Sequence, residues 1–279
     1  MSGSGNARPQ TFDQHATSWR EWQASPWGRL RYRLAAHTLD RVLQPLGSGC
    51  QVLDVGGGDG ADSVRLAEQG HLVTILDHSE PLLARAAAAA AEAGVTGRVR
   101  TVLGDVGRLA EPGFLGAAGQ PGFDLVLCHN VLHYLSGGGD IVRCLVGTVR
   151  IGGLLSLMAP NPAMDVLAAA VRDLDPVAAL AVLDAPTVRS VTFEHDMRRL
   201  DPRDVEDLLA MCGCRVSDRF GIRCVMDLIA DNEKKAAPGF FADLERLELA
   251  LCDREPYWRT ARFWQLVATR TSPSPVEAE

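Results

Sequence analysis

Residues 52–60, VLDVGGGDG, decide how this chain folds. Val52–Val55 is a short apolar run of the kind that forms a buried strand, and a glycine-rich turn follows it at Gly56–Gly60. Glycine suits this turn because the bend is tight and the backbone must approach a ligand closely. The helix expected from Ala61 onward presents free backbone N–H groups to whatever lies in the turn. The stretch therefore predicts a strand, a ligand-binding turn and a helix.

Three aspartates stand where strands of the predicted sheet end. Asp54 lies inside the opening stretch, Asp77 ends the apolar run 71–77, and Asp105 follows the next run. The glycine turn is compact and lacks the G-x-G-x-x-G spacing of dinucleotide-binding enzymes. Together, the turn and the three acids resemble the class I S-adenosylmethionine-dependent methyltransferases. An ordinary strand–helix turn with incidental acids, or an NAD site, are the alternatives.

The resemblance implies S-adenosylmethionine as the cofactor and gives each acid a task. Asp77 would accept hydrogen bonds from both ribose hydroxyls, and Asp105 would accept one from the adenine amino group. Asp54 and the loop amides would hold the methionine part, whose ammonium and carboxylate need opposite partners. The cofactor-binding residues implied at these strand ends are Asp54, Gly56, Gly57, Gly58, Asp77, His78, Asp105 and Val106.

The composition is that of a globular protein built around one large domain. The chain has 279 residues, of which 47% are hydrophobic and 23% are charged. It contains no apolar run of about 18 residues, so we expect no membrane helix. We expect residues 1–11, which lack the apolar core of a signal peptide, and residues 271–279 to be disordered around a single domain at 12–270.

Cysteine usage and net charge limit the compartment and the partners. The seven cysteines are odd in number and form no CxxC pair, so we expect reduced thiols in a cytoplasmic protein and no metal site. The net charge of −7 disfavours nonspecific binding to nucleic acid, because affinity for the phosphate backbone comes from Lys and Arg. Arginines cluster in several places, and these clusters are read either as solvated helix faces or as a local basic face.

Apolar strands alternate with helical segments after an N-terminal helical cap at 12–47. This alternation predicts an α/β fold: a Rossmann-like, seven-stranded, mostly parallel sheet with helices on both faces and its ligand site at the carboxyl ends of the strands. Residues 161–200, after the fifth strand, are interpreted as a helical lid insert that shapes the acceptor pocket, with 185–199 irregular. The expected strands lie at 51–55, 72–76, 99–103, 123–128, 154–159, 214–222 and 263–269.

Five further stretches resemble one family within the methyltransferases. They are Trp27–Arg31, Leu127–Leu132, Gly152–Met158, Gly221–Asp227 and Cys252–Tyr257. Together they resemble the bacterial tRNA 5-carboxymethoxyuridine methyltransferases, which methylate the carboxylate of that base at the wobble position. The resemblance covers nearly all of the expected domain.

The family resemblance assigns more site residues. It implies that Arg31 pairs with the methionine carboxylate of the cofactor, since a guanidinium fork matches a carboxylate. It places His129 beside the reacting sulfonium, where a structural histidine is an equally good interpretation. Arg223 would reach the carboxylate of the substrate, and Tyr257 would help it.

The identity of the acceptor stays open at this point. A carboxylate acceptor is already ionised at neutral pH and needs no base, whereas a phenol or an amine favours a nearby base. His133 is the best placed base by sequence, although His133 with Tyr134 is better interpreted as a cap of the loop after the fourth strand. The insert carries Asp165 and Asp173 where the family is basic and aromatic, which suits tRNA poorly.

Three functional hypotheses follow from these observations. The first is methyl transfer to a carboxylate oxygen in the tRNA anticodon loop. The second is a small-molecule O-, N- or C-methyltransferase of secondary metabolism on the same scaffold. The third is a cofactor-binding regulator without catalysis. The oligomeric state is open under all three hypotheses.

Overall fold

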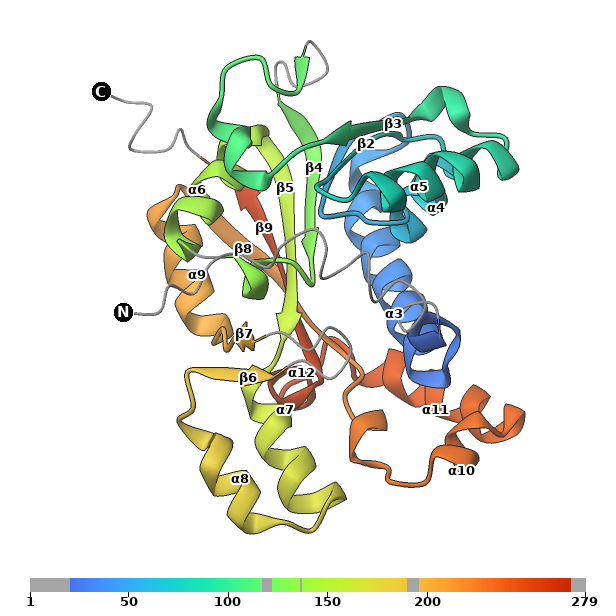
Figure 1. Cartoon of the computed structure of the whole chain (residues 1–279), viewed down its shortest axis with the longest axis vertical. Coiled ribbons are helices and arrows are strands. Elements are labelled where there is room, and N and C mark those ends of the chain that lie inside the picture. The colour runs from blue at the N-terminus through green and yellow to red at the C-terminus, as the bar shows by residue number, and fades with distance from the viewer. Residues whose placement is uncertain (1–20, 117–121, 136, 190–195, 272–279) are drawn as a thin grey trace.

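Seven strands form one sheet in the computed structural model, which describes residues 21–116, 122–135, 137–189 and 196–271 (Figure 1). The strand order is β3 (Val99–Leu103), β2 (Leu72–Asp77), β1 (Gln51–Val55), β4 (Phe123–His129), β5 (Val149–Pro160), β9 (Phe263–Arg270) and β8 (Cys214–Ile222). β9 runs antiparallel to β5 and β8, and the other neighbouring pairs are parallel. The predicted Rossmann-like, mostly parallel seven-stranded sheet is confirmed.

The strand order reverses direction at β1, which places a ligand site there. β1 pairs with β2 on one side and with β4 on the other, both in parallel. In open parallel sheets, ligands bind at the carboxyl ends of the strands beside such a reversal. In Figure 1 the carboxyl ends of β4 and β5 point down, toward the insert and the C-terminal helices.

Helices cover both faces of the sheet, as predicted (Figure 1). The helices of one face are α3 (Pro26–Leu43), α4 (Ala61–Glu68) and α5 (Glu80–Glu92), and those of the other are α6 (Gly138–Thr148) and α9 (Pro202–Met211). Neighbouring residues of β1 enter opposite cores: Val52 packs in the cluster of Leu66, and Leu53 packs in the cluster of Leu145. This alternation follows from the two-residue period of a strand.

The N-terminal cap is helical where the structure describes it. Ser25 begins α3 by accepting a hydrogen bond from the Gly28 N–H at 3.1 Å, and Pro26 takes the first helical position. Gly47 ends the segment with a φ of 76°, which favours glycine. The predicted disordered stretch 1–11 and nearly all of the predicted tail lie outside the described residues. None of the described helices is both long and apolar enough to span a membrane.

The insert after β5 contains more regular structure than the sequence predicts. It comprises α7 (Pro162–Leu167), a π-helical turn at Ala168–Arg172 and α8 (Pro176–Leu183). The expectation of an irregular 185–199 is wrong in part, because β6 (Thr187–Arg189) and β7 (Asp196–Arg198) pair antiparallel. The pairing escapes notice because each strand has only three residues.

Arg199 ties the end of the insert back to its start. Its guanidinium donates to the carbonyl oxygens of Pro162 at 2.7 Å, Leu183 at 3.1 Å and Ala185 at 3.2 Å. The Leu183 and Ala185 carbonyls lie at the end of α8 and in the turn after it, where backbone acceptors lack helical partners, and Pro162 is the first residue of α7. One buried side chain therefore holds the insert together as a unit.

The loop after β8 is fixed by a buried carboxylate. Glu248, on α11 (Pro238–Leu251), accepts hydrogen bonds from the N–H groups of Cys224, Val225 (3.0 Å) and Met226 (2.8 Å). Burial raises the pKa of Glu248. Arg223, just before these amides, has a φ of 65°, an uncommon conformation for a non-glycine residue. Two short helices, α10 (Asn232–Ala236) and α12 (Tyr257–Thr260), complete this region.

Candidate active site

A cavity of about 770 Å³ opens at the carboxyl ends of β1, β2 and β4. We divide its lining into two halves. The strand-end half contains the glycine loop 56–58 with Arg31, Asp54, Asp77, Asp105 and His129. The insert half contains Trp27, Arg172, Arg223, Lys235 and Arg262. The structure thus brings most of the predicted site residues to one place.

Two glycines of the loop are required for different reasons, one for close packing and one for its backbone conformation. A Cβ on Gly57 would lie 2.6 Å from the Asp54 carboxylate. Gly58 has a φ of 55°, and a Cβ there would meet only Leu82, at 3.8 Å. The loop therefore presses on Asp54 from one side and turns its backbone toward open space on the other.

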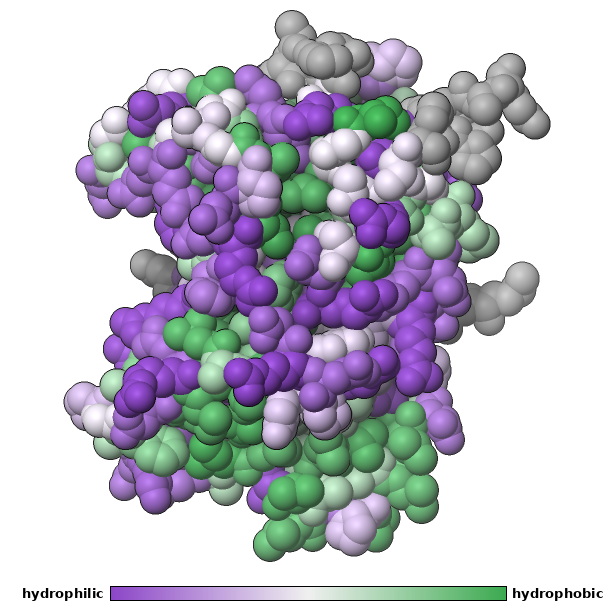
Figure 2. Space-filling model, turned by 180° about the vertical axis from the view of Figure 1, so that it is seen from behind, coloured by the Kyte–Doolittle hydropathy of each residue, from purple (hydrophilic) through white to green (hydrophobic). Residues whose placement is uncertain are grey.

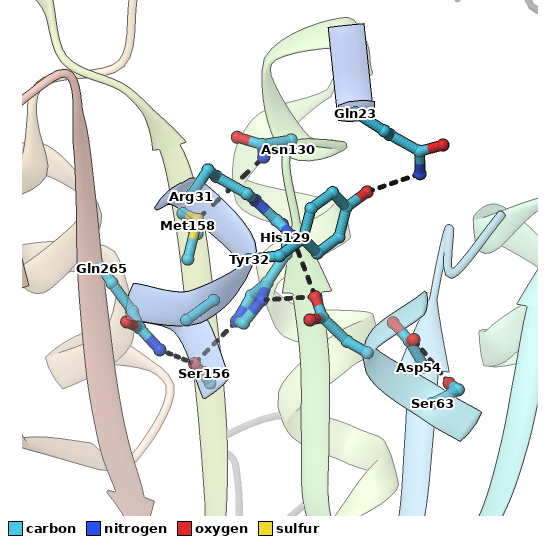
Figure 3. Close-up of polar contacts among 12 residues, drawn as sticks. Gln23, Arg31, Tyr32, Asp54, Ser63, His129, Asn130, Ser156, Met158 and Gln265 are labelled. Carbon is cyan, nitrogen blue, oxygen red and sulfur yellow. Dashed lines mark hydrogen bonds and ion pairs between the residues drawn. The ribbon is translucent and has the colours of Figure 1, made fainter. Parts of the chain in front are cut away.

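Asp54 lies beneath the glycine loop as a buried carboxyl group. It accepts a hydrogen bond from the Ser63 hydroxyl at 2.6 Å (Figure 3). Burial raises the pKa of Asp54 to about 7, because taking a carboxylate out of water disfavours its ionised form. The group is consequently poised between its neutral and ionised forms near neutral pH.

Asp77 holds two backbone amides at the end of β2. It accepts from the Gly58 N–H and from the Ser79 N–H, each at 2.9 Å. His78 also lines the cavity, with Nδ1 4.0 Å from Asp77 Oδ1. Asp77 thereby couples the glycine loop to the start of α5.

Asp105 sits at the end of β3, with Val106 beside it. Its exposed carboxylate accepts from the Gly107 N–H at 2.7 Å and caps a short helical turn, while Val106 is buried and also lines the cavity. An acceptor and an apolar surface therefore lie side by side, which suits a flat base that carries an amino group.

Arg31 and Asp62 form a buried ion pair in the cavity wall. Arg31 Nη1 lies 3.1 Å from Asp62 Oδ2, and His129 Nδ1 lies 3.9 Å from the same oxygen. Burial alone raises the pKa of Asp62, but the charge of Arg31 and the contact with His129 outweigh it and hold this pKa well below its ordinary value. Asp62 is therefore ionised, and it fixes the orientation of Arg31.

His129 belongs to a buried hydrogen-bond chain across three strands (Figure 3). His129 Nε2 and Ser156 Oγ lie 2.9 Å apart, and Gln265 Nε2 donates to Ser156 Oγ at 3.0 Å. Thr38 Oγ1, on α3, donates to Gln265 Oε1 at 2.7 Å. Burial lowers the pKa of His129. The chain orients the imidazole and ties it to the helix that carries Arg31.

His133 lines the cavity, whereas Tyr257 lies outside it. His133 is buried against the cavity, its ring 4.2 Å from that of Tyr134, and burial and the nearby Arg262 lower the pKa of His133 to about 3. Tyr257 begins α12, is 42% exposed and is absent from the cavity lining. The structure therefore brings His133 to the site and does not bring Tyr257 there.

Arg223 lines the insert half and forms an ion pair with Asp227. Its Nε donates to Asp227 Oδ2 at 2.8 Å, its Nη2 contacts Asp227 Oδ1, and its Nη1 donates to the Trp27 carbonyl at 3.2 Å. This side chain is buried, so the pair is shielded from water. Arg223 is thus engaged by a carboxylate of its own chain.

The sequence interpretation missed several functional candidates. They are Asp62, Ser156, Asp227, Lys235 and Gln265. Ser156 and Gln265 did leave a signal, because each interrupts an apolar strand, and a buried polar residue requires a hydrogen-bond partner. Lys235 left none, since only the fold distinguishes it from its neighbour Lys234.

The strand-end half fits S-adenosylmethionine. Among the described residues, Arg31 Nε and Asn130 Oδ1 are buried without hydrogen-bond partners. Asp77, Asp105 and Arg31 supply acceptors for hydroxyls and amines and a donor for a carboxylate. Cations and anions side by side suit a ligand that carries an ammonium, a carboxylate, a ribose and a base.

Comparisons with known proteins identify the family. A family model for a methyltransferase domain matches residues 52–153. The tRNA 5-carboxymethoxyuridine methyltransferase of Escherichia coli K12 is 30% identical over 247 residues, covering 87% of this chain and 89% of that protein. A ubiquinone biosynthesis O-methyltransferase of Caulobacter vibrioides is 32% identical over 138 residues, covering 49% of this chain and 51% of that protein.

Solved structures share the fold. The magnesium protoporphyrin IX methyltransferase of Synechocystis, with bound S-adenosylhomocysteine, has a TM-score of 0.62 at 16% identity and covers 94% of this chain and 97% of its own. A methyltransferase of Streptomyces caelestis has a TM-score of 0.56 at 17% identity, with coverage of 87% and 90%. At these identities the likeness concerns the fold alone.

Proposed function

This chain belongs to the class I S-adenosylmethionine-dependent methyltransferases, in the family of the tRNA 5-carboxymethoxyuridine methyltransferase, and we propose that it methylates a carboxylate oxygen of its acceptor. It is an enzyme with S-adenosylmethionine as its cofactor. The hypothesis of a regulator without catalysis accordingly loses its support. A cytoplasmic location remains part of the proposal, supported by seven free cysteines.

The cationic lining of the insert half carries this proposal. Arg172, Arg189, Arg223, Lys235 and Arg262 line the part of the cavity beyond the strand ends, and they outnumber the three aspartates that line it with them, Asp165, Asp173 and Asp227. Cations at close quarters favour an anionic acceptor, and a carboxylate is the anion that can also act as a nucleophile at neutral pH without a base.

His129 and His133, two of the three histidines that line the cavity, support a mechanism without general base catalysis. His129 donates or accepts through Nε2 toward Ser156, and burial lowers the pKa of His129. His133 has a pKa of about 3, again because of burial, which makes it a weak base. His133 therefore does not suit proton removal from a phenol or an amine, which needs a base with a pKa near neutrality, and the Nε2 of His129 is engaged by Ser156.

The residues of this chain have the task of binding, orienting and excluding water. S-adenosylmethionine supplies an electrophilic methyl group on a sulfonium sulfur when it is bound. Arg31 would hold its carboxylate while Asp62 keeps the guanidinium in place, and Asp77 and Asp105 would hold ribose and base. The insert covers the acceptor, which favours an aligned reactant pair over hydrolysis.

The acceptor we propose is the 5-carboxymethoxyuridine of a tRNA anticodon loop. The full-length similarity to the E. coli enzyme supports this choice. The test uses labelled S-adenosylmethionine and tRNA that carries unmethylated carboxymethoxyuridine, followed by mass spectrometry of the nucleosides. We expect a stoichiometric methyl ester on that base and none on tRNA with an unmodified wobble uridine. If the protein binds the cofactor but transfers no label to the modified tRNA, this acceptor is wrong.

A small-molecule acid is the second candidate acceptor. The outer side of the insert exposes Val171, Leu174, Val177, Leu180 and Leu183, and Figure 2 shows apolar residues gathered on the lower part of the molecule. Phosphate backbones are bound by Lys and Arg, so this apolar surface and the net charge of −7 speak against a large tRNA footprint. Methylation of small carboxylic acids, with tRNA unlabelled, would support this candidate.

A further inference from the structure

Three arginines of the insert half already have carboxylate partners. Arg223 pairs with Asp227, with Nε 2.8 Å from Oδ2. Arg172 pairs with Asp173 at 2.7 Å, and Arg262 Nη1 lies 2.7 Å from Asp165 Oδ1. A substrate anion would have to compete with an attached carboxylate at each of them. These arginines are therefore better suited to shape the half than to receive the acceptor.

Lys235 is the exception among these four cations of the insert half. It lies on α10, lines the cavity and is only 7% exposed. Its ammonium lies 5.4 Å from the ring centre of Trp27. Within the part of the chain that the structure describes, no carboxylate oxygen lies within 4.0 Å of this ammonium.

The surroundings of Lys235 explain why a ligand anion fits it. The charged groups that act on it are Asp227, Asp231, Arg172 and Arg223. Asp227 is occupied by Arg223, and Asp231 accepts from the Lys234 N–H at 2.8 Å. Burial lowers the pKa of Lys235, because a cation out of water is costly unless it is paired.

Arg189 is the other cavity-lining cation without an ion pair among the described residues. Its side chain is exposed on β6, so water can solvate the charge. Lys235 has less of this compensation, since the residue is only 7% exposed and its side chain meets water through the cavity. A bound anion would therefore stabilise the charge of Lys235 more than the charge of Arg189.

We propose that Lys235, rather than the carboxylate-paired Arg223, binds the acid group of the methyl acceptor. This inference rests on the proposed carboxylate acceptor and names the residue that selects it. An ammonium is a compact point charge that can hold one carboxylate oxygen and leave the other free to attack. A guanidinium fork tends to engage both oxygens and would quench the nucleophile.

The first test compares Lys235→Met with the matched variant Lys234→Met. Lys234 is the adjacent lysine and its side chain is exposed. With S-adenosylhomocysteine bound, we measure the thermal shift caused by sodium acetate and by the nucleoside 5-carboxymethoxyuridine against equal concentrations of chloride. We expect the wild-type protein and Lys234→Met to be stabilised by the carboxylates, and Lys235→Met to lose this shift while its affinity for S-adenosylhomocysteine is unchanged. A Lys235→Met protein that keeps the shift would overturn the proposal.

Two further readouts separate recognition from a structural role. Without ligands, Lys235→Met is expected to be at least as stable as the wild type, since it removes an unpaired buried charge, whereas a lysine needed for packing on Trp27 would lower the melting temperature on removal. In turnover, Lys235→Met is expected to raise KM for the carboxylate acceptor about 10- to 100-fold, and Lys235→Arg to keep binding while lowering kcat. A clear loss of ligand-free stability, or an unchanged KM, would overturn the proposal.

The failures of the two proposals are distinguishable. If wild-type protein shows the carboxylate shift but methylates neither tRNA nor small acids, the proposed acceptor chemistry is wrong and the anion site stands. If wild-type protein forms methyl esters and Lys235→Met does so with unchanged KM, the acceptor chemistry stands and the role of Lys235 is wrong.

Discussion

The two halves of the cavity are held in place by different means. In the strand-end half, residues at consecutive strand ends bind backbone amides, as Asp77 does with Gly58 and Ser79. In the insert half, side chains from distant segments are held by ion pairs, as Arg262 is by Asp165. A scaffold of strand ends and amides admits few substitutions, whereas ion-paired side chains from separate segments can be exchanged. The difference leads us to expect that the proposed acceptor site tolerates substitution more readily than the cofactor site.

One buried ion pair is an exception to this contrast, because it lies in the strand-end half. Breaking it should cause the largest loss of stability among our predictions. Arg31 and Asp62 belong to the strand-end half but depend on each other as an ion pair. Arg31→Met leaves a buried carboxylate without its cation and should lower the free energy of unfolding by about 3–5 kcal/mol. Denaturant unfolding measures this loss.

Two controls belong to that experiment. The exposed pair of Arg33 and Glu245 provides the matched variant Arg33→Met, which should cost no more than about 1 kcal/mol. The double variant Arg31→Met with Asp62→Asn should recover most of the loss. If Arg31→Met costs no more than Arg33→Met, the buried pair does not stabilise the strand-end half.

The next effect sharpens the claim that the strand-end half binds the cofactor. Asp77→Ala should weaken the binding of S-adenosylhomocysteine about 100-fold, near 3 kcal/mol, because it removes a ribose acceptor and frees two loop amides. Calorimetric titration measures the affinity. Glu92→Ala, an exposed change on α5, should leave it as in the wild type. Unchanged affinity in Asp77→Ala would show that the cofactor is bound elsewhere.

The smallest effect concerns pH and again belongs to the strand-end half. Because burial raises the pKa of Asp54 to about 7, the folded protein keeps this group neutral at pH values where the unfolded chain ionises it. Its contribution to stability is full below about pH 4 and is lost as pH rises through 7. Without cofactor, the wild type should lose about 2 kcal/mol between pH 5 and pH 8 that Asp54→Asn retains. Identical pH dependence of unfolding in both proteins would contradict the buried, neutral Asp54.

The strand-end half was predictable because its signals are local. The glycine turn and Asp77 stand at the ends of apolar strands whose alternation with helices fixes the sheet. Asp62 was missed although it lies two residues after the turn, because an acid in the first turn of a helix has an ordinary explanation. The partnership of Ser156 with Gln265 needed the order of β5 and β9, which no local pattern contains.

The insert half was predictable only in outline. A lid after the fifth strand follows from chain order, but the pairing of Arg223 with Asp227 depends on how the loop after β8 turns. Lys234 and Lys235 are identical in type and adjacent in sequence. Only their positions around α10, and the way this helix packs, make Lys234 exposed and Lys235 buried. Specificity therefore resides where sequence patterns carry the least information.

The three backbone amides that Glu248 binds affect how the set of acceptors can change between related enzymes. The main chain at 224–226 is anchored from α11 by a carboxylate that does not line the cavity. Side chains on either side of this anchor can therefore change without moving the backbone that carries them. Substitutions that change the acceptor can therefore accumulate in this loop, by evolution or by design, while its backbone and the methyl donor site keep their positions.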